Sequence, residues 1–114
     1  MHEMSIALSI IELAEEEIKK AGAKKVNEIE LEIGTLSGVE IEALEFAMEV
    51  AVINTCLEGA KVNISQVQAV AKCNNCGHTF ETVNFFPLCP ECSKYDNTLI
   101  KGKEMRVKSL LVDD

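Results

Sequence analysis

The chain has 114 residues, of which 47% are hydrophobic and 4% aromatic, and its formal net charge is −8. This length suits one small domain with a smaller satellite, and the core must be built mainly from aliphatic side chains. The negative charge argues against nucleic acid and anionic membranes as partners, because binding to either depends on Lys and Arg. No apolar run reaches the roughly 18 residues that would predict a membrane-spanning helix.

The first residues do not have the pattern of a secretory signal. The chain begins with Met-His-Glu instead of a basic segment, and acidic residues follow at 12 and at 15–17. We therefore expect a cytoplasmic protein, in which cysteines remain thiols because that compartment is reducing.

Residues 4–21 are predicted to form a helix, because apolar residues recur there at steps of three and four. Gly22 stands where the left-handed C-cap of such a helix is expected. The stripe that we expect to face the core consists of Met4, Ala7, Leu8, Ile11, Ala14 and Ile18.

A strand and a second helix are predicted next. Residues 26–33 alternate between apolar and polar positions, which is typical of a strand with one buried face. Ser37 and Glu40 then have the spacing of a capping box, which predicts a helix that runs to about Ile53. We expect Phe46, Val50 and Ile53 to widen its apolar stripe, and Glu42, Glu45 and Glu49 to share its solvated face.

Two more strands are predicted at 60–71 and 104–112, each from apolar residues near a period of two. The alternation slips after Ile64, which indicates a bulge or burial on both faces. A polar stretch at 93–103, in which we assign no strand, leads to the last one.

These elements predict an α+β fold in which a small three-stranded sheet packs with two helices and carries an inserted cysteine ribbon. The two amphipathic helices cannot bury their apolar stripes alone, and packing on a sheet buries both. We expect one domain to comprise residues 1–71 and 104–114, and a zinc-ribbon domain to comprise residues 72–103.

The segment from Cys73 to Cys92 carries the strongest chemical signal. Two Cys-x-x-Cys pairs, Cys73 with Cys76 and Cys89 with Cys92, are separated by twelve residues. Two such pairs at this separation are typical of a tetrahedral zinc site with four thiolate ligands. Four sulfurs complete the tetrahedron, so the pattern predicts a structural site and not a catalytic one.

Other residues near the ribbon have simpler interpretations. We interpret His78 as a loop histidine near the metal, since four sulfurs already close a zinc shell. Cys56 has no partner at ligand spacing, so we interpret it as a small, partly buried side chain. The aromatic residues Phe80, Phe85 and Phe86 are expected to pack over the metal knuckles.

The N-terminus offers a second set of metal ligands. The α-amino group of Met1, the backbone nitrogen of His2 and the imidazole of His2 can form fused chelate rings around one ion. Deprotonated backbone nitrogens suit square-planar Ni(II) or Cu(II). The backbone nitrogen or the carboxylate of Glu3 would supply a fourth donor. Because the α-amino group must lose a proton, affinity is expected to rise with pH.

Three sequence features together resemble the HypA/HybF family of hydrogenase nickel-incorporation proteins. They are the start Met1-His2-Glu3-Met4-Ser5, the four-cysteine ribbon, and the segment Gly102-Lys-Glu-Met-Arg-Val-Lys-Ser-Leu110. The order of elements is similar to that family along essentially the whole chain.

The resemblance implies a metallochaperone without catalytic turnover. It makes His2 the nickel ligand, with Met1 and Glu3 at positions of backbone or carboxylate donors, and it implies that the ribbon zinc is structural. Some family members have an acidic residue near the nickel at the position of Glu40, but here the capping box gives Glu40 a competing role.

The partners implied by the resemblance are the large subunit of a [NiFe]-hydrogenase, a nickel-handling GTPase and, in some members, urease. The chain is expected to be a monomer or a homodimer.

Two other functions are compatible with a zinc ribbon. The first is a protein- or nucleic-acid-interaction module, against which the acidic charge and the absence of Lys and Arg between Cys73 and Cys92 argue. The second is a zinc hydrolase, which requires an open metal position that four cysteines do not leave.

Overall fold

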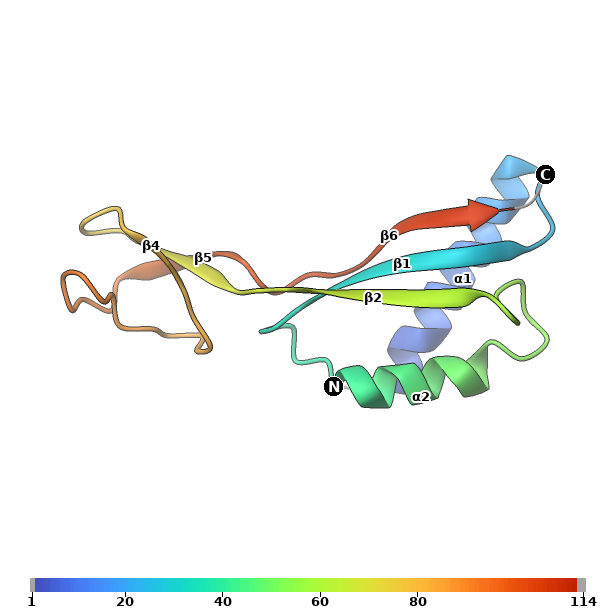
Figure 1. Cartoon of the computed structure of the whole chain (residues 1–114), viewed down its shortest axis with the longest axis horizontal. Helices are drawn as coiled ribbons and strands as arrows, with labels where there is room; N and C mark the ends of the chain where they lie inside the picture. The colour runs from blue at the N-terminus through green and yellow to red at the C-terminus, as the bar shows by residue number, and fades with distance from the viewer. Residues whose placement is uncertain (1, 113–114) are drawn as a thin grey trace. The chain divides into compact units, whose positions relative to one another are not determined.

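The computed structural model describes residues 2–112; Met1, Asp113 and Asp114 lie outside the described residues. The elements in chain order are α1 (Glu3–Ala21), β1 (Val26–Gly34), α2 (Ile41–Ala51), β2 (Lys61–Val67), β3 (Val70–Cys73), β4 (Thr79–Glu81), β5 (Asn97–Lys101) and β6 (Met105–Val112) (Figure 1). No helix within residues 2–112 is both long and apolar enough to span a membrane.

The chain divides into two compact units. Unit 1 consists of Met1–Leu31, Val39–Ser65 and Arg106–Asp114, and unit 2 consists of Glu32–Gly38 and Gln66–Met105. The observed α+β fold, with two helices, a three-stranded sheet and a second small sheet that bears the cysteines, confirms the predicted fold class. The predicted domain boundaries remain a prediction, because separate folding of the two parts is a property that only experiment tests.

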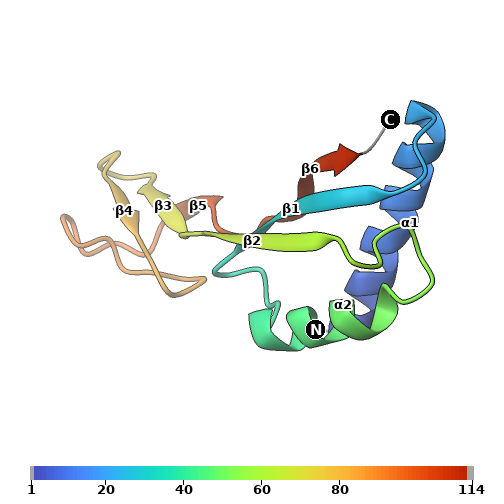
Figure 2. The same ribbon diagram turned by 45° about the vertical axis from the view of Figure 1, so that its right-hand side comes forward.

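Unit 1 is built around a sheet of strand order β2-β1-β6. Figures 1 and 2 show α1 crossing one face of this sheet, and α2 lying alongside β2. The central strand contributes three fully buried side chains to unit 1, Val26, Ile29 and Leu31. The core is aliphatic, as the composition predicted, because the buried residues of α1 and α2 are Ile, Ala, Leu and Met.

Helix α1 begins one residue before the predicted start and ends at Ala21 as predicted, and Gly22 forms its C-cap with a left-handed φ of 69°. The predicted buried stripe was partly wrong, because Met4 and Leu8 are exposed while Ile6 and Ile10 are buried. The predicted and the observed set of buried residues both recur at helical spacing, because this helix is rich in isoleucine. The sheet that covers α1 decides which apolar residues lie inside.

The predicted capping box of Ser37 and Glu40 is wrong. Helix α2 begins at Ile41 with Glu40 as its N-cap, and no side chain near it in sequence caps it. Ser37 lies in a turn in which its backbone N–H donates to the carbonyl of Gly34. The backbone N–H of Glu40 instead donates to the carboxylate of Glu3, at 3.1 Å. The Glu3 carboxylate, which is distant in sequence, therefore accepts the Glu40 backbone N–H that the capping box was expected to satisfy.

The apolar stripe of α2 is narrower than predicted. Leu44, Ala47 and Met48 are buried, whereas Phe46, Val50 and Ile53 are exposed. The helix also ends at Ala51, two residues before the predicted end. One small sheet cannot cover the full circumference of α2, so part of its apolar surface remains in solvent.

The predicted strand at 60–71 is two strands that belong to different sheets. β2 ends at Val67, and β3 begins at Val70 in an antiparallel sheet of strand order β4-β3-β5 within unit 2 (Figure 2). The slip in alternation after Ile64 precedes this change of sheet, and the pairing of β3 with β5 has a bulge or register irregularity between Val70 and Ala71. β5 lies inside the polar stretch in which no strand was predicted, because its pairing partner β3 is remote in sequence.

Two glycines in unit 2, Gly34 and Gly102, allow two backbone segments to lie very close together. A Cβ added at Gly34 would lie 2.0 Å from the carbonyl oxygen of Gly102. The backbone N–H of Gly34 donates to the carbonyl of Glu104, and the N–H of Leu36 donates to the carbonyl of Gly102. These bonds require that no side chain be present at position 34.

Replacing Gly34 with Ala is therefore expected to destabilise unit 2 by about 3 kcal/mol or more, because the clash is with backbone that cannot move independently. The matched control is Gly22→Ala, where a Cβ would meet nothing within 4 Å but φ is 69°. That control should cost about 1 kcal/mol. Chemical denaturation monitored by residue-resolved NMR measures both, and equal costs would contradict the close-packing argument.

Candidate metal centres

The four cysteines are presented by two tight turns in unit 2. In the first, which follows β3, the backbone N–H of Gly77 donates to the carbonyl of Cys73, and Gly77 has a φ of 79°. In the second, the N–H of Ser93 donates in the same way to the carbonyl of Cys89. Each turn brings the two cysteines of one Cys-x-x-Cys pair to the same place.

The four sulfur atoms lie within 4.8 Å of one another. The Sγ atoms of Cys73 and Cys92 are 3.5 Å apart, and those of Cys76 and Cys89 are 3.7 Å apart. A tetrahedral zinc ion with Zn–S bonds of about 2.3 Å places its sulfurs about 3.8 Å apart. The geometry therefore fits Zn(II), and the predicted four-cysteine zinc site is confirmed.

The electrostatics of the cluster favour a bound cation. The backbone N–H of Cys76 donates to the Cys73 sulfur at 3.4 Å and lowers the pKa of Cys73 to about 6. The backbone N–H of His78 also acts to lower the pKa of Cys76, but burial and the neighbouring sulfurs outweigh it and raise that pKa to about 12. Four adjacent sulfurs therefore cannot all ionise easily, unless a metal ion compensates their charge.

His78 does not belong to the ligand set. Its Nε2 lies 4.0 Å from the Glu91 carboxylate, and its ring stacks on Phe80 with centroids 6.0 Å apart. Its backbone carbonyl accepts the N–H of Cys73. The loop interpretation of His78 agrees with this position. The packing role predicted for Phe85 and Phe86 is wrong, because these rings are 51% and 86% exposed.

Cys56 is not part of the four-cysteine cluster. It is buried in unit 1, and its backbone N–H donates to the carboxylate of Glu15 at 3.0 Å. Burial, followed by the charge of Glu15, raises the pKa of the Cys56 thiol to about 11. The thiol therefore stays protonated and packs as a small side chain, as predicted.

The second candidate centre is the start of α1. His2 is the N-cap of this helix, is exposed, and accepts the backbone N–H of Ile6 on its carbonyl. Met1, the predicted amine donor, lies outside the described residues. Within residues 2–112, only the four cysteines form a group of three or more side chains arranged to hold a metal ion. The side chains of these described residues therefore do not by themselves build a nickel site at the start of α1.

Glu3 and Glu40 are nevertheless brought together by the fold. The Glu40 backbone N–H donates to the Glu3 carboxylate, and this bond holds the pKa of Glu3 below its usual value of 4.5. The bond connects the first turn of α1 to the N-cap of α2. No sequence pattern marked it, because the two residues are 37 positions apart.

Fold and site define a small metal-binding protein with a closed zinc centre and no open catalytic position on that zinc. The sequence profile of the family described as "Hydrogenase/urease nickel incorporation, metallochaperone, hypA" matches residues 1–112. The chain belongs to this HypA family of nickel metallochaperones, which act in hydrogenase maturation and are not enzymes.

Curated relatives cover nearly the whole chain. A hydrogenase maturation factor HypA from Parabacteroides distasonis is 46% identical over 98% of this chain and 97% of its own. One from Geobacter metallireducens is 42% identical over 99% of this chain and 100% of its own.

A solved structure agrees with this assignment. The solution structure of the nickel metallochaperone HypA from Helicobacter pylori covers 98% of this chain and 97% of its own, with a TM-score of 0.71 and 28% identity. The chain is thus a nickel metallochaperone for hydrogenase or urease maturation, with a four-cysteine zinc site. The nucleic-acid module and the zinc hydrolase are therefore set aside.

Removing one zinc ligand should unfold unit 2, because the free energy of zinc binding is also folding free energy. We expect Cys89→Ser to lower the zinc content from about one ion per chain and to broaden the NMR signals of unit 2. Cys56→Ala is the control and should keep its zinc. Full zinc content and a native unit 2 in Cys89→Ser would contradict the assignment.

The bond between Glu3 and Glu40 should depend on pH. Because the folded-state pKa of Glu3 is lowered, its stabilising contribution is complete above about pH 5 and is lost as the pH falls through the folded pKa. The amide proton of Glu40 should shift along the same titration in NMR spectra. Glu3→Gln should abolish this titration and the control Glu12→Gln should not; an unchanged curve in Glu3→Gln would exclude the bond.

Proposed function

We propose that the N-terminal residues bind the transferable Ni(II) ion. The proposed donors are the α-amino group of Met1, the backbone nitrogen and imidazole of His2, and the backbone nitrogen of Glu3. This set is a chelate built from consecutive residues, and such a chelate needs no preformed side-chain pocket. Backbone nitrogens that have lost their protons suit square-planar nickel.

The position of His2 at the helix start carries the proposal. The first backbone N–H groups of an α-helix have no acceptor within the helix. His2 is the N-cap and Glu3 the first helical residue, so their nitrogens can bind a metal without breaking the helical hydrogen-bond ladder. The His2 carbonyl still accepts the N–H of Ile6, which orders the backbone at His2.

The contact between Glu3 and Glu40 supports the backbone nitrogen of Glu3 as donor over its carboxylate. The carboxylate already accepts the Glu40 backbone N–H at 3.1 Å. Coordination by that carboxylate would weaken the connection to α2, whereas coordination by the nitrogen preserves it. Glu40 itself then acts as an N-cap near the nickel and not as a ligand.

We further propose that the chain delivers its nickel to the large subunit of a [NiFe]-hydrogenase, with a GTPase as helper, and that urease is a second recipient. Membership of a hydrogenase and urease maturation family supports these partners. The four thiolates of the zinc site support action in the cytoplasm, which is reducing. We propose that the chain acts there as a monomer or homodimer. In this proposal residues 1–71 and 104–114 form the nickel-binding domain, and residues 72–103 form the zinc-ribbon domain.

His2→Ala should remove nickel binding and leave zinc and fold intact, because only one of the two metals depends on that imidazole. Isothermal titration with Ni(II) on untagged, zinc-loaded protein measures the affinity, and metal analysis measures the zinc. For the wild type, affinity should increase as the pH rises through the reference α-amino pKa of about 7.7–8.0.

Two further proteins make the nickel experiment decisive. His78→Ala is the matched control and should bind nickel as the wild type does, since His78 is remote in sequence from the N-terminus. A chain whose Met1 amine is acylated should lose nickel as His2→Ala does. Nickel affinity retained in both the His2→Ala and the acylated chain would exclude the N-terminal chelate.

A further inference from the structure

Helix α2 presents a row of exposed apolar side chains. Phe46, Val50 and Ile53 are 67%, 48% and 57% exposed. Phe46 and Val50 are one turn apart on the helix, and Ile53 follows in the turn after its last residue. Single exposed apolar residues are ordinary on a protein surface, but an aligned row of them is typical of an interaction site.

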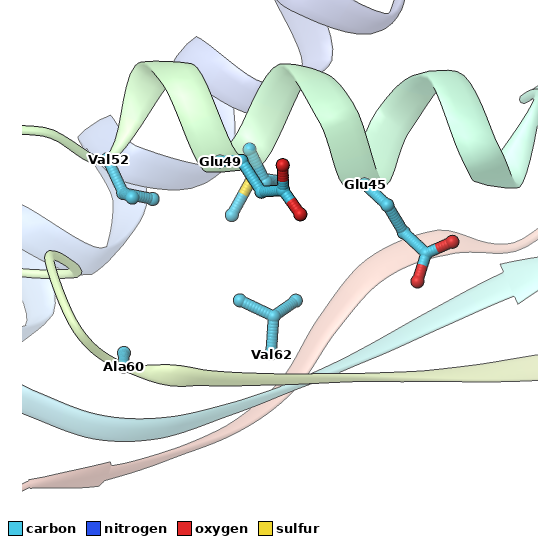
Figure 3. A pocket seen from close by; sticks show the side chains of 6 residues that line it. Glu45, Glu49, Val52, Ala60 and Val62 are labelled. Carbon is cyan, nitrogen blue, oxygen red and sulfur yellow. The ribbon is translucent and has the colours of Figure 1, made fainter.

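A pocket lies between α2 and β2, and it borders this row through Glu49, which is three residues after Phe46 and four before Ile53. It has a volume of about 250 Å³ and is lined by Glu45, Met48, Glu49, Val52, Ala60 and Val62. Figure 3 shows the carboxylates of Glu45 and Glu49 extending from α2 on the side that faces β2, while Val62 points from β2 toward the helix. The pocket therefore combines apolar walls with two negative groups.

Neither carboxylate belongs to the ion pairs found among residues 2–112, such as Lys20 with Glu17 and His78 with Glu91. Helix α2 contains no Lys or Arg that would neutralise them. A metal ion is the poorer occupant, because within the described residues only the cysteine cluster offers three ligands close together. The negative charge of the pocket is thus available to a cation from another molecule.

We propose that this face of α2, consisting of the exposed row and the pocket, docks a basic amphipathic segment of a partner protein. A Lys or Arg side chain has a long apolar stem and a charged end, which matches the apolar walls and the carboxylates of the pocket. Apolar side chains of the same segment would cover the row formed by Phe46, Val50 and Ile53. This arrangement is the helix-in-groove mode of recognition.

Charge distinguishes this partner from a second copy of the chain. Two copies that met symmetrically through α2 would bring Glu42, Glu45 and Glu49 toward the same residues of the other copy, and like charges brought together at an interface repel. A basic segment meets the same face with complementary charge.

The position of α2 connects the docking face to nickel transfer. The helix starts at the residue after Glu40, whose backbone N–H is bonded to Glu3. A segment bound along α2 would lie close to the first turn of α1, where nickel is proposed to bind. This connection to transfer rests on the proposed function, whereas docking itself does not.

The test is a titration with a synthetic helical peptide that carries a leucine row flanked by arginines, at physiological ionic strength. We expect wild-type protein to bind it with NMR shift changes confined to α2 and residues 60–62. Glu45→Gln/Glu49→Gln should weaken binding about tenfold through lost charge pairing. Phe46→Ser should weaken it to a similar extent, and all three residues are exposed, so both variants should fold.

The matched controls are Glu12→Gln/Glu16→Gln, which removes two exposed carboxylates with the same helical spacing from α1, and Leu111→Ser, which removes an exposed apolar side chain from β6. Both should bind the peptide as the wild type does. Equal losses in the controls, shifts spread over all acidic surfaces, or no binding would overturn the proposal.

Two more measurements separate the remaining outcomes. If a second copy covers this face, sedimentation would show a dimer for the wild type and a monomer for Phe46→Ser. That result would also overturn the proposal. Nickel affinity should be unchanged in Glu45→Gln/Glu49→Gln. Failure of the His2 chelate and failure of docking are therefore read from different variants.

Discussion

The structure of unit 2 depends on four sulfur atoms that are held within 4.8 Å of one another. Four thiolates at this distance repel one another, and a divalent cation turns that repulsion into attraction. The two turns that carry the cysteines and the sheet β4-β3-β5 surround this centre. Because zinc binding and folding are linked, the centre functions as a cross-link in a unit that has few large apolar side chains inside.

In unit 1, a single hydrogen bond between residues remote in sequence fixes the first turn of α1. The first turn of a helix normally frays, and an exposed terminal histidine would have no fixed place. Here the Glu3 carboxylate holds the Glu40 amide, so the start of α1 is tied to α2. A metallochaperone must release its cargo, and a chelate at the end of the chain suits release better than a closed cage, because its donors can be protonated one at a time.

The two metals therefore differ in the way that their binding is organised. The zinc ligands come from two turns that are remote from each other in sequence, and two of them, Cys73 and Cys89, are fully buried. The proposed nickel ligands are consecutive in sequence and lie at an exposed helix start. The acidic, partly apolar face proposed for docking belongs to α2, the helix whose N-cap Glu40 is bonded to Glu3, which is consistent with a partner that approaches the transferable ion.

The sequence by itself determined the features that arise from neighbours in the chain. The cysteine spacing predicted the zinc site, the periodicities predicted α1 and β1, and Gly22 predicted the end of α1, because each depends on local geometry alone. Tertiary structure alone decided which apolar residues of α1 and α2 are covered, that 60–71 divides between two sheets, and that Glu3 replaces the expected capping box at Glu40. The reason is the same in each case: these outcomes depend on contacts between residues remote in sequence, and a local pattern carries no information about such a partner.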